Sequence, residues 1–188
     1  MKIKRFVCNA YQENAYVVSD GAECIIIDPG FTGGELPALY DYLAAEGLTP
    51  SAILLTHSHP DHTCGLQPLV ERFGIPVKAA QAETGAFAGK FMVIATPGHT
   101  PDSVCYYSEK DAILFTGDTL FAGTIGRTDL PGGNYDDEIR SIMEQLIFLP
   151  GETVIYPGHG PQSTIARERT QNPFLEPFNE REELEELN

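Results

Sequence analysis

Four apolar runs in this chain stop abruptly at residues that can bind a metal ion, and this pattern constrains the fold most. The runs are AILLT before His57, MVIATPG before His99, AILFTG before Asp118 and TVIYPG before His159. Runs of this length and composition are typical of buried strands, and loops at strand ends are where a rigid sheet presents converging side chains. All five histidines of the chain lie in this setting, which indicates one shared site.

The first run leads into HSHPDH, residues 57–62, which holds three of the five histidines. Residues two apart in extended backbone point the same way, so His57 and His59 can bind one ion. Asp61 and His62 emerge as the chain turns, and they can address a second ion beside the first. Imidazole and carboxylate together suit a divalent transition metal.

The later runs supply the remaining candidate ligands. His99 and His159 can each complete one of the two sites, and Asp118 has two oxygens with which to bridge them. This gives two metals about 3.5–4 Å apart, the usual geometry of two-metal hydrolases.

Length and charge restrict the class of protein further. The 188 residues suffice for one domain, 1–188, with an acidic tail from about 176 that we interpret as a solvated end. A formal net charge of −15 disfavours nucleic-acid partners, although a small anionic substrate needs only one local cation. No apolar stretch is long enough to span a bilayer, and the apolar piece of the N-terminus is too short for a secretory signal. We therefore expect a cytoplasmic protein with no membrane partner.

The four cysteines form no CxxC pair and are expected to be reduced. Cys8, Cys24 and Cys105 lie in strand-like segments and are interpreted as small core residues. Cys64 follows His62 by two positions, which leaves a functional role open.

Periodicity predicts mixed strands and helices. The expected strands include hairpins over 15–28, around an Asp20-Gly21 turn, and over 103–118, with further strands at 51–56, 76–80, 91–98 and 153–160. Helices are expected over 35–48, 61–73 and 136–149, the last capped by Asp136, and another begins near Ser163. Hairpins and crossovers together indicate an α/β sandwich of mixed sheets.

The segment HSHPDH resembles the HxHxDH signature of the metallo-β-lactamase fold superfamily, and the resemblance extends from IIIDPG to YPGHGP. The segments TPGHTPDS, FTGDTLFAGTIGRTDLPGG and GHGPQSTIARERTQNPF resemble the short glyoxalase II-like hydrolases (hydroxyacylglutathione hydrolase class). The resemblance implies a four-layer αβ/βα sandwich of two mixed β-sheets flanked by helices.

The resemblance also implies a ligand set for two divalent ions, zinc first, with iron or manganese as alternatives. The first ion is implied on His57, His59 and His99, the second on Asp61, His62 and His159, with Asp118 between them. Asp28 matches an acid that orients ligands without binding metal, and its alternative interpretation is a turn residue before Pro29. The flavodiiron reductases carry Glu at the position of His59, so that role is disfavoured.

The implied activity is hydrolysis of an S-acylglutathione-type thioester by a metal-bridging hydroxide that Asp61 orients. If all five histidines are ligands, none is left as a general acid. A thiol with a pKa of about 8.5 can leave as thiolate, which favours a thioester over a lactam or lactone. Classical glyoxalase II has a helical C-terminal domain, whereas this chain has room for one or two helices after His159. Glutathione as the carrier is therefore left open, as is the oligomeric state.

Two further alternatives stay open. Arg127 is a candidate anchor for a substrate carboxylate, or else a structural arginine paired with an acid such as Asp129. Persulfide dioxygenases resemble this chain in a GRTD loop and bind one iron through the residues equivalent to His57, His99 and Asp118. Hydrolysis of a lactone or a β-lactam is a weaker alternative to hydrolysis of a small-molecule thioester.

Overall fold

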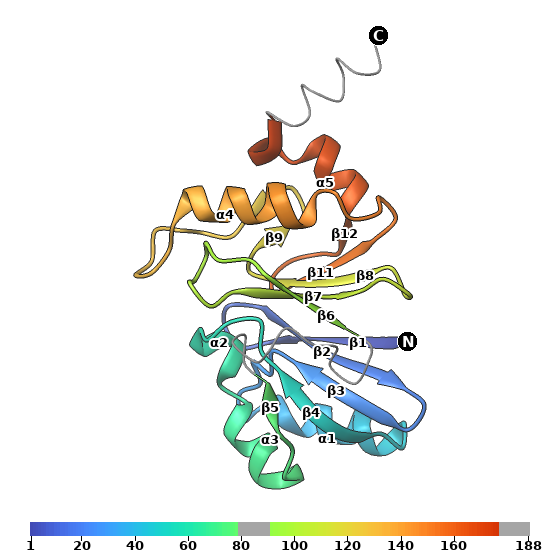
Figure 1. The fold of residues 1–188 in the computed structure, drawn as a ribbon. Coiled ribbons are helices and arrows are strands. Elements are labelled where there is room, and N and C mark those ends of the chain that lie inside the picture. Colours follow the sequence, from blue (N-terminus) through green and yellow to red (C-terminus); the bar gives the residue numbers. More distant parts are fainter. Residues whose placement is uncertain (79–90, 177–188) are drawn as a thin grey trace. The chain divides into compact units, whose positions relative to one another are not determined.

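The computed structural model describes residues 1–78 and 91–176 (Figure 1). It divides the chain into two compact units, Met1–Glu83 and Thr84–Asn188. Each unit contains one five-stranded sheet with parallel and antiparallel pairs, so the expected α/β class with two mixed sheets is confirmed. The single domain 1–188 stays a prediction, and the acidic tail lies, from residue 177, outside the described residues.

The sheet of the first unit has the order β1-β2-β3-β4-β5. Its strands are β1 (Lys2–Cys8), β2 (Glu13–Asp20), β3 (Glu23–Ile27), β4 (Thr49–Leu54) and β5 (Val77–Lys78). The strand expected over 76–80 is thus present at Val77–Lys78, and residues 79 and 80 lie outside the described residues. The neighbours β3 and β4 are parallel, so their carboxyl ends lie at the same edge. There the N–H of Asp28 donates to the carbonyl of Leu54 at 3.0 Å, which places Asp28 beside the HSHPDH loop.

The turns of this unit follow from glycine placement. The β2–β3 hairpin closes through Gly21 and Ala22, and only Gly21 has a positive φ (71°), which fits a turn with glycine at its first central position. Helix α1 (Leu36–Ala45) ends at Gly47, whose φ is 63°, and Leu48 N–H bonds back to the Leu43 carbonyl at 2.8 Å. This is the Schellman arrangement, and it confirms the expected helix end.

The helix expected over 61–73 is two helices, α2 (Pro60–Thr63) and α3 (Leu66–Phe73). The break lies at Gly65, whose N–H donates to the carbonyl of Pro29 at 2.8 Å instead of to its own helix. A Cβ on Gly65 would lie 2.7 Å from that same oxygen, so only glycine lets the two segments approach. The short α2 therefore holds Asp61 and His62 directly against the loop that carries Asp28.

The sheet of the second unit has the order β12-β11-β8-β7-β6, and β9 and β10 form a separate hairpin. The strands are β6 (Met92–Ala95), β7 (Val104–Ser108), β8 (Ile113–Gly117), β9 (Leu120–Phe121), β10 (Thr124–Ile125), β11 (Val154–Pro157) and β12 (Ser163–Thr164). Parallel pairing of β8 with β11 brings their carboxyl ends together, and Gly158 N–H donates to the Gly117 carbonyl at 2.8 Å. Asp118 and His159 therefore leave the sheet side by side.

Helix α4 (Tyr135–Ser141) is capped by Asn134, not by Asp136 as expected. The extended backbone of Asn134 lets its side chain accept from the N–H groups of Asp136 and Asp137, which Asp136 inside the first turn cannot do. The helix runs on as a π-helical turn, Ile142–Leu146, before Ile147. Helix α5 (Ile165–Gln171) and a 3-10 turn, Pro173–Leu175, follow β12, close to the expected start at Ser163.

Each sheet has a helix-covered apolar core. In the first unit α1 and α3 pack Leu39 and Leu69 against strand residues such as Ile53, and in the second the helices pack Leu146 and Ile165 in the same way. Three of the cysteines are buried as expected: Cys8, Cys24 and Cys105. Within residues 1–78 and 91–176, no helix has the length and apolar composition needed to cross a membrane.

Candidate metal centre

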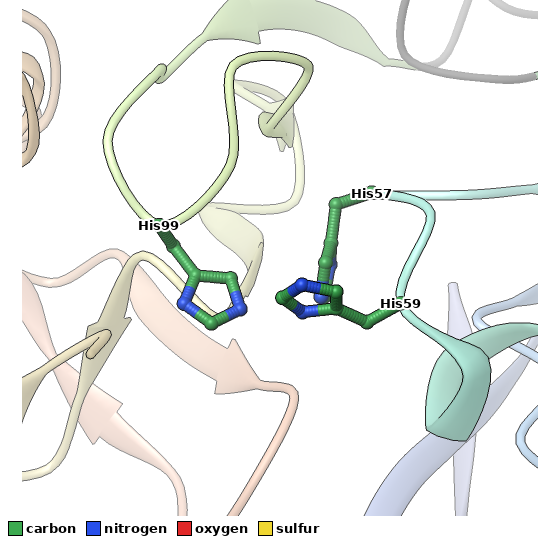
Figure 2. Close-up of side chains that lie close together, drawn as sticks. All are labelled: His57, His59 and His99. Carbon is green, nitrogen blue, oxygen red and sulfur yellow. The ribbon is translucent and has the colours of Figure 1, made fainter. Parts of the chain in front are cut away.

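The loop after β4 carries the histidines of the first unit (Figure 2). His57 is 1% exposed and His59 follows it in extended backbone, with φ −62° and ψ 145°. Their rings lie edge to face with centroids 4.8 Å apart, as expected for residues two apart in an extended segment. Pro60 then starts α2, and this short helix places the ring of His62 4.2 Å from that of His57. The spacing of HSHPDH therefore gathers three imidazoles within one unit.

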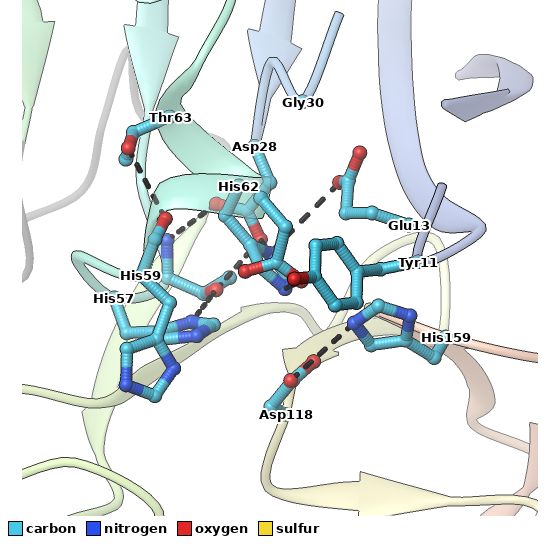
Figure 3. Close-up of polar contacts among 12 residues, drawn as sticks. Tyr11, Glu13, Asp28, Gly30, His57, His59, His62, Thr63, Asp118 and His159 are labelled. Atoms are coloured by element: carbon cyan, nitrogen blue, oxygen red, sulfur yellow. Dashed lines mark hydrogen bonds and ion pairs between the residues drawn. The ribbon is translucent and has the colours of Figure 1, made fainter. Parts of the chain in front are cut away.

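Asp28 organises two of these imidazoles through three hydrogen bonds (Figure 3). Its Oδ1 accepts from the N–H of Thr56 at 2.7 Å, and its Oδ2 accepts from the Thr56 hydroxyl at 2.6 Å. The same Oδ2 lies 3.1 Å from Nδ1 of His62, and the Thr56 hydroxyl lies 3.0 Å from Nδ1 of His57. Asp28 is 2% exposed and has a φ of 47°, a left-handed conformation that Asp tolerates at some cost. The expectation that Asp28 orients ligands has this geometry in its favour.

These contacts set the tautomers of both rings. The Thr56 hydroxyl has one hydrogen, and donating it to Asp28 leaves its oxygen to accept from Nδ1–H of His57. A carboxylate oxygen can only accept, so Nδ1 of His62 carries a hydrogen as well. In both neutral imidazoles Nε2 is then the nitrogen whose lone pair can bind a metal. This is the support that metal-binding histidines generally receive from outer carboxylates.

Two residues that the sequence did not single out hold this loop. Glu13, fully buried at the start of β2, brings its Oε1 to 3.9 Å from Nδ1 of His62. Asn9, on the β1–β2 turn, donates from Nδ2 to the carbonyls of Gly30 and Asp61 at 3.0 and 2.9 Å. A Cβ on Gly30 would lie 2.1 Å from Oε2 of Glu13, so glycine is required where these segments meet. The sequence signal was an Asn in a strand connection, which is too common to indicate a site.

His99 follows β6 in the second unit (Figure 2), and one side-chain carboxylate and one backbone carbonyl hold it there. Its N–H donates to Oε2 of the fully buried Glu138 at 2.8 Å, and its Nδ1 lies 2.7 Å from the carbonyl oxygen of Arg127. A carbonyl only accepts, so Nδ1 carries the hydrogen and Nε2 is again the nitrogen that can bind a metal. The predicted role of His99 as a ligand is therefore compatible with its tautomer.

Asp118 lies between the two histidines of the second unit. Its Oδ2 is 3.6 Å from Nε2 of His99 and 3.5 Å from Nε2 of His159, and Figure 3 marks the second contact. In the first unit, Nε2 of His62 lies 3.8 Å from Oδ2 of Asp61. Such separations exceed the hydrogen-bond range of about 2.7–3.2 Å. Two ligand atoms bound tetrahedrally at about 2.1 Å from one ion lie about 3.4 Å apart, so these donor sets fit a divalent metal.

Glu138 adds an acid that the sequence analysis missed, because a glutamate in a first helical turn is usually exposed. The pKa of Glu138 is raised to about 8, chiefly by burial and also by the charge of Asp118, while the N–H groups of His99 and Gly126 act to lower it. Two neighbouring carboxylates in a buried setting repel each other, and a divalent ion would relieve this repulsion. The charge distribution of the second unit thus also fits a cation.

Arg127 pairs with Asp129, the alternative left open from the sequence. Its Nε and Nη2 donate to the two carboxylate oxygens at 2.7 and 2.8 Å, and both side chains are exposed. This pairing lowers the pKa of Asp129 to about 2. Anchoring of a substrate carboxylate by Arg127 stays a prediction, and the only contribution to the site that the structure describes for this residue is its carbonyl group.

Cys64 is exposed, and its Sγ lies 3.1 Å from the carbonyl of Gly30. Burial of part of the side chain and the nearby charge of Glu13 raise the pKa of this thiol. A thiol with a raised pKa is a poor nucleophile and a poor metal ligand at neutral pH. Cys64 therefore does not extend the ligand set of the first unit.

Comparison with known proteins gives three kinds of match. A family model described as "Metallo-beta-lactamase superfamily" matches residues 8–94 and 81–159. The chain is 37% identical to a probable metallo-hydrolase, YqgX, of Bacillus subtilis (strain 168), over 95% of this chain and 99% of the relative. It is 30% identical to the hydroxyacylglutathione hydrolase GloC of Haemophilus influenzae, over 93% of this chain and 98% of that protein.

Two solved structures are similar to this chain over more than nine-tenths of its length. The crystal structure of the BLEG-1 B3 metallo-beta-lactamase has a TM-score of 0.83 and 37% identity, over 93% of this chain and 99% of that chain. The crystal structure of TTHA1623 in a di-iron-bound form has a TM-score of 0.82 and 37% identity, over 92% of this chain and 100% of that chain. Both likenesses extend over the two units.

Proposed function

The chain belongs to the metallo-beta-lactamase superfamily, and from this premise we propose that it is a two-metal hydrolase of thioesters of the S-acylglutathione type. Its fold is the metallo-beta-lactamase fold, and the superfamily is one of metallo-hydrolases that bind divalent metals. The finer proposal concerns how many ions the ligand groups hold, and which bond is cleaved.

We assign the ions as the family resemblance implies. One ion would be held by His57, His59 and His99, the other by Asp61, His62 and His159, and Asp118 would serve both. The tautomers described above support this assignment, because three of the five histidines have Nδ1 engaged with an oxygen acceptor. Zinc suits this donor set, and iron is the alternative, since one solved relative holds two iron ions.

When bound, such ions lower the pKa of a bound water and polarise a carbonyl oxygen. The residues of this chain then have separate tasks. Asp61 keeps 18% of its side chain exposed, so its carboxylate can accept a hydrogen bond from a water molecule and orient it toward the substrate. Asp28 keeps His57 and His62 in the tautomer that binds metal, and the Arg127 carbonyl does the same for His99.

The observation that carries the choice of a thioester is the engagement of the histidines. Nδ1 of His57, His62 and His99 is held by an oxygen atom, so Nε2 is the atom that would bind the metals. With His59 and His159 also assigned as ligands, no histidine is left to deliver a proton to a leaving amine or alkoxide. A thiolate leaves without a proton, because its parent thiol has a pKa of about 8.5. Similarity to a hydroxyacylglutathione hydrolase supports the same choice.

The test combines metal analysis with three substrates. The purified protein is loaded with zinc or iron, its metal content is measured, and it is assayed with S-lactoylglutathione, a chromogenic cephalosporin and glutathione persulfide with an oxygen electrode. We expect two metals per chain and a turnover of the thioester that exceeds β-lactam turnover by at least about 10²-fold. The amine of a lactam needs a general acid in order to leave, and such an acid typically contributes about 10²–10⁴-fold to the rate.

Other outcomes would replace the proposal. One iron per chain together with oxygen uptake would indicate a persulfide dioxygenase, and β-lactam turnover alone would indicate a lactamase. Substituting His59→Ala in the first unit and His159→Ala in the second should each remove one ion and leave the other. If both variants keep both ions, the two ligand groups are not the metal site.

A further inference from the structure

Glu138 connects two loops of the second unit on which the orientation of His99 depends. It is fully buried in the first turn of α4, and its Oε2 accepts from the N–H of His99 at 2.8 Å. The helix approaches the His99 turn so closely that a Cβ on Gly98 would lie 2.3 Å from the Cα of Glu138. The N–H of Asn134, the cap of α4, donates to the Gly98 carbonyl at 2.8 Å. The start of α4 is thus anchored on the residue before His99.

The other oxygen of Glu138 packs on the second loop. A Cβ on Gly126 would lie 2.8 Å from Oε1 of Glu138 and 1.8 Å from the carbonyl oxygen of Asp118. Gly126 immediately precedes Arg127, whose carbonyl accepts from Nδ1 of His99. One carboxylate therefore contacts both the backbone of His99 and the loop that fixes its ring.

We propose that Glu138 is a positioning residue that aims Nε2 of His99 at the metal beside Asp118. This deepens the proposed function and rests on it, because the aim matters only if His99 is a ligand. The 3.6 Å between Nε2 of His99 and Oδ2 of Asp118 is the separation that Glu138 maintains. Residues that orient ligands in this way typically contribute 10–100-fold to metal affinity.

The second unit offers a matched control in Glu168, a second buried glutamate. It is 1% exposed on α5, and its Oε2 accepts from the N–H of Gly123 at 2.7 Å and from Nδ2 of Asn172 at 2.9 Å. Its contacts hold the β9–β10 hairpin and α5, and none of the contacts that the structure describes for it involves a proposed ligand. Glu168→Leu should therefore lower the melting temperature without changing the metal site.

The test compares Glu138→Leu, Glu138→Asp and Glu138→Gln with Glu168→Leu. Zinc affinity is measured by competition with a chromophoric chelator, and the tautomer of His99 is measured by ¹⁵N NMR of the metal-free protein. We expect Glu138→Leu and Glu138→Asp to weaken the zinc site that His99 serves 10–100-fold and to lower the fraction of His99 with hydrogen on Nδ1. Glu138→Gln keeps an acceptor of the same length, so its zinc affinity should stay within about threefold of the original.

The outcomes separate this proposal from the proposed function. Unchanged zinc affinity and an unchanged His99 tautomer in Glu138→Asp would overturn the positioning role. The same loss of zinc affinity in Glu168→Leu would also overturn it, because the effect would then reflect stability alone. If the unaltered protein binds neither zinc nor iron, the proposed function fails, while the NMR measurement still decides whether Glu138 sets the state of His99.

Discussion

Replacing Asp28 by Asn should weaken binding of both metals, because one carboxylate serves a ligand of each. Asp28 accepts from the Thr56 N–H at Oδ1, and it accepts from the Thr56 hydroxyl and His62 at Oδ2. An amide nitrogen at the first position would face the Thr56 N–H, a donor against a donor. This leaves two buried donors unsatisfied, at a cost of about 1–3 kcal/mol each.

The other orientation of the Asn amide places a donor where Oδ2 was. His62 must then accept at Nδ1, and the Thr56 hydroxyl must turn its hydrogen toward Nδ1 of His57. Both rings would shift to the tautomer that carries hydrogen on Nε2, the atom proposed to bind metal. An outer-sphere loss of this kind costs 10–100-fold in metal affinity, which corresponds to about 1.4–2.8 kcal/mol.

The assay is chelator competition for zinc at both sites, with thermal unfolding of the metal-free protein as a check on folding. Asp28→Asn should weaken both sites 10–100-fold, whereas Thr56→Val, which removes the link to His57 alone, should weaken one. Asp111→Asn is the matched control, since its carboxylate accepts from the Ser108 hydroxyl at 3.0 Å in a hairpin of the second unit. Unchanged affinity at both sites in a folded Asp28→Asn protein would refute the reasoning.

Three further predictions concern single positions. Gly30→Ala should lower the free energy of unfolding by about 1–3 kcal/mol, because the new Cβ would lie 2.2 Å from the carbonyl oxygen of Asp61. Gly34→Ala, whose Cβ would meet nothing within 4 Å, should leave that free energy nearly unchanged in denaturant unfolding. Arg127→Ala should return the pKa of its partner Asp129 from about 2 to near its ordinary 3.9, as NMR titration would measure. The ion pair therefore contributes to folding stability above about pH 3.9, and this contribution is lost as pH falls toward 2. If Arg127 also anchors substrate, the same substitution should raise KM more than it lowers kcat. In the native protein a thiol reagent should modify only Cys64, and slowly, whereas after unfolding it should modify all four cysteines. Mass spectrometry would count the labels, and prompt labelling of two or more cysteines in the native protein would contradict the described burial.

The ligand-type residues could be predicted because each follows a buried strand, and strand ends are readable from short apolar runs. Within each unit the structure brings His57 beside His59 and His62, and Asp118 between His99 and His159, and their role as metal ligands stays a prediction. The role predicted for Asp28 came only from the resemblance, because the local sequence equally allowed a turn residue.

The supporting residues could not be predicted, because their contacts join segments far apart in the chain. Glu138 bonds to a backbone N–H 39 positions away, and Thr56 acts through a single hydroxyl that no periodicity reveals. The cap of α4 was misplaced because Asp136 and Asn134 are both good cap residues, and only backbone conformation distinguishes them. The break at Gly65 depends on a carbonyl of another loop, so the local helical pattern concealed it.

The pairing of β3 with β4 also has a consequence for protein engineering. The N–H of Asp28 donates to Leu54, and the carboxylate of Asp28 accepts from Thr56, so these bonds join the two strand ends. The six-residue histidine motif therefore cannot be grafted alone onto another scaffold. A transplant must carry both strands in their native alignment, and an insertion of one residue in either would separate the acid from the imidazoles it orders.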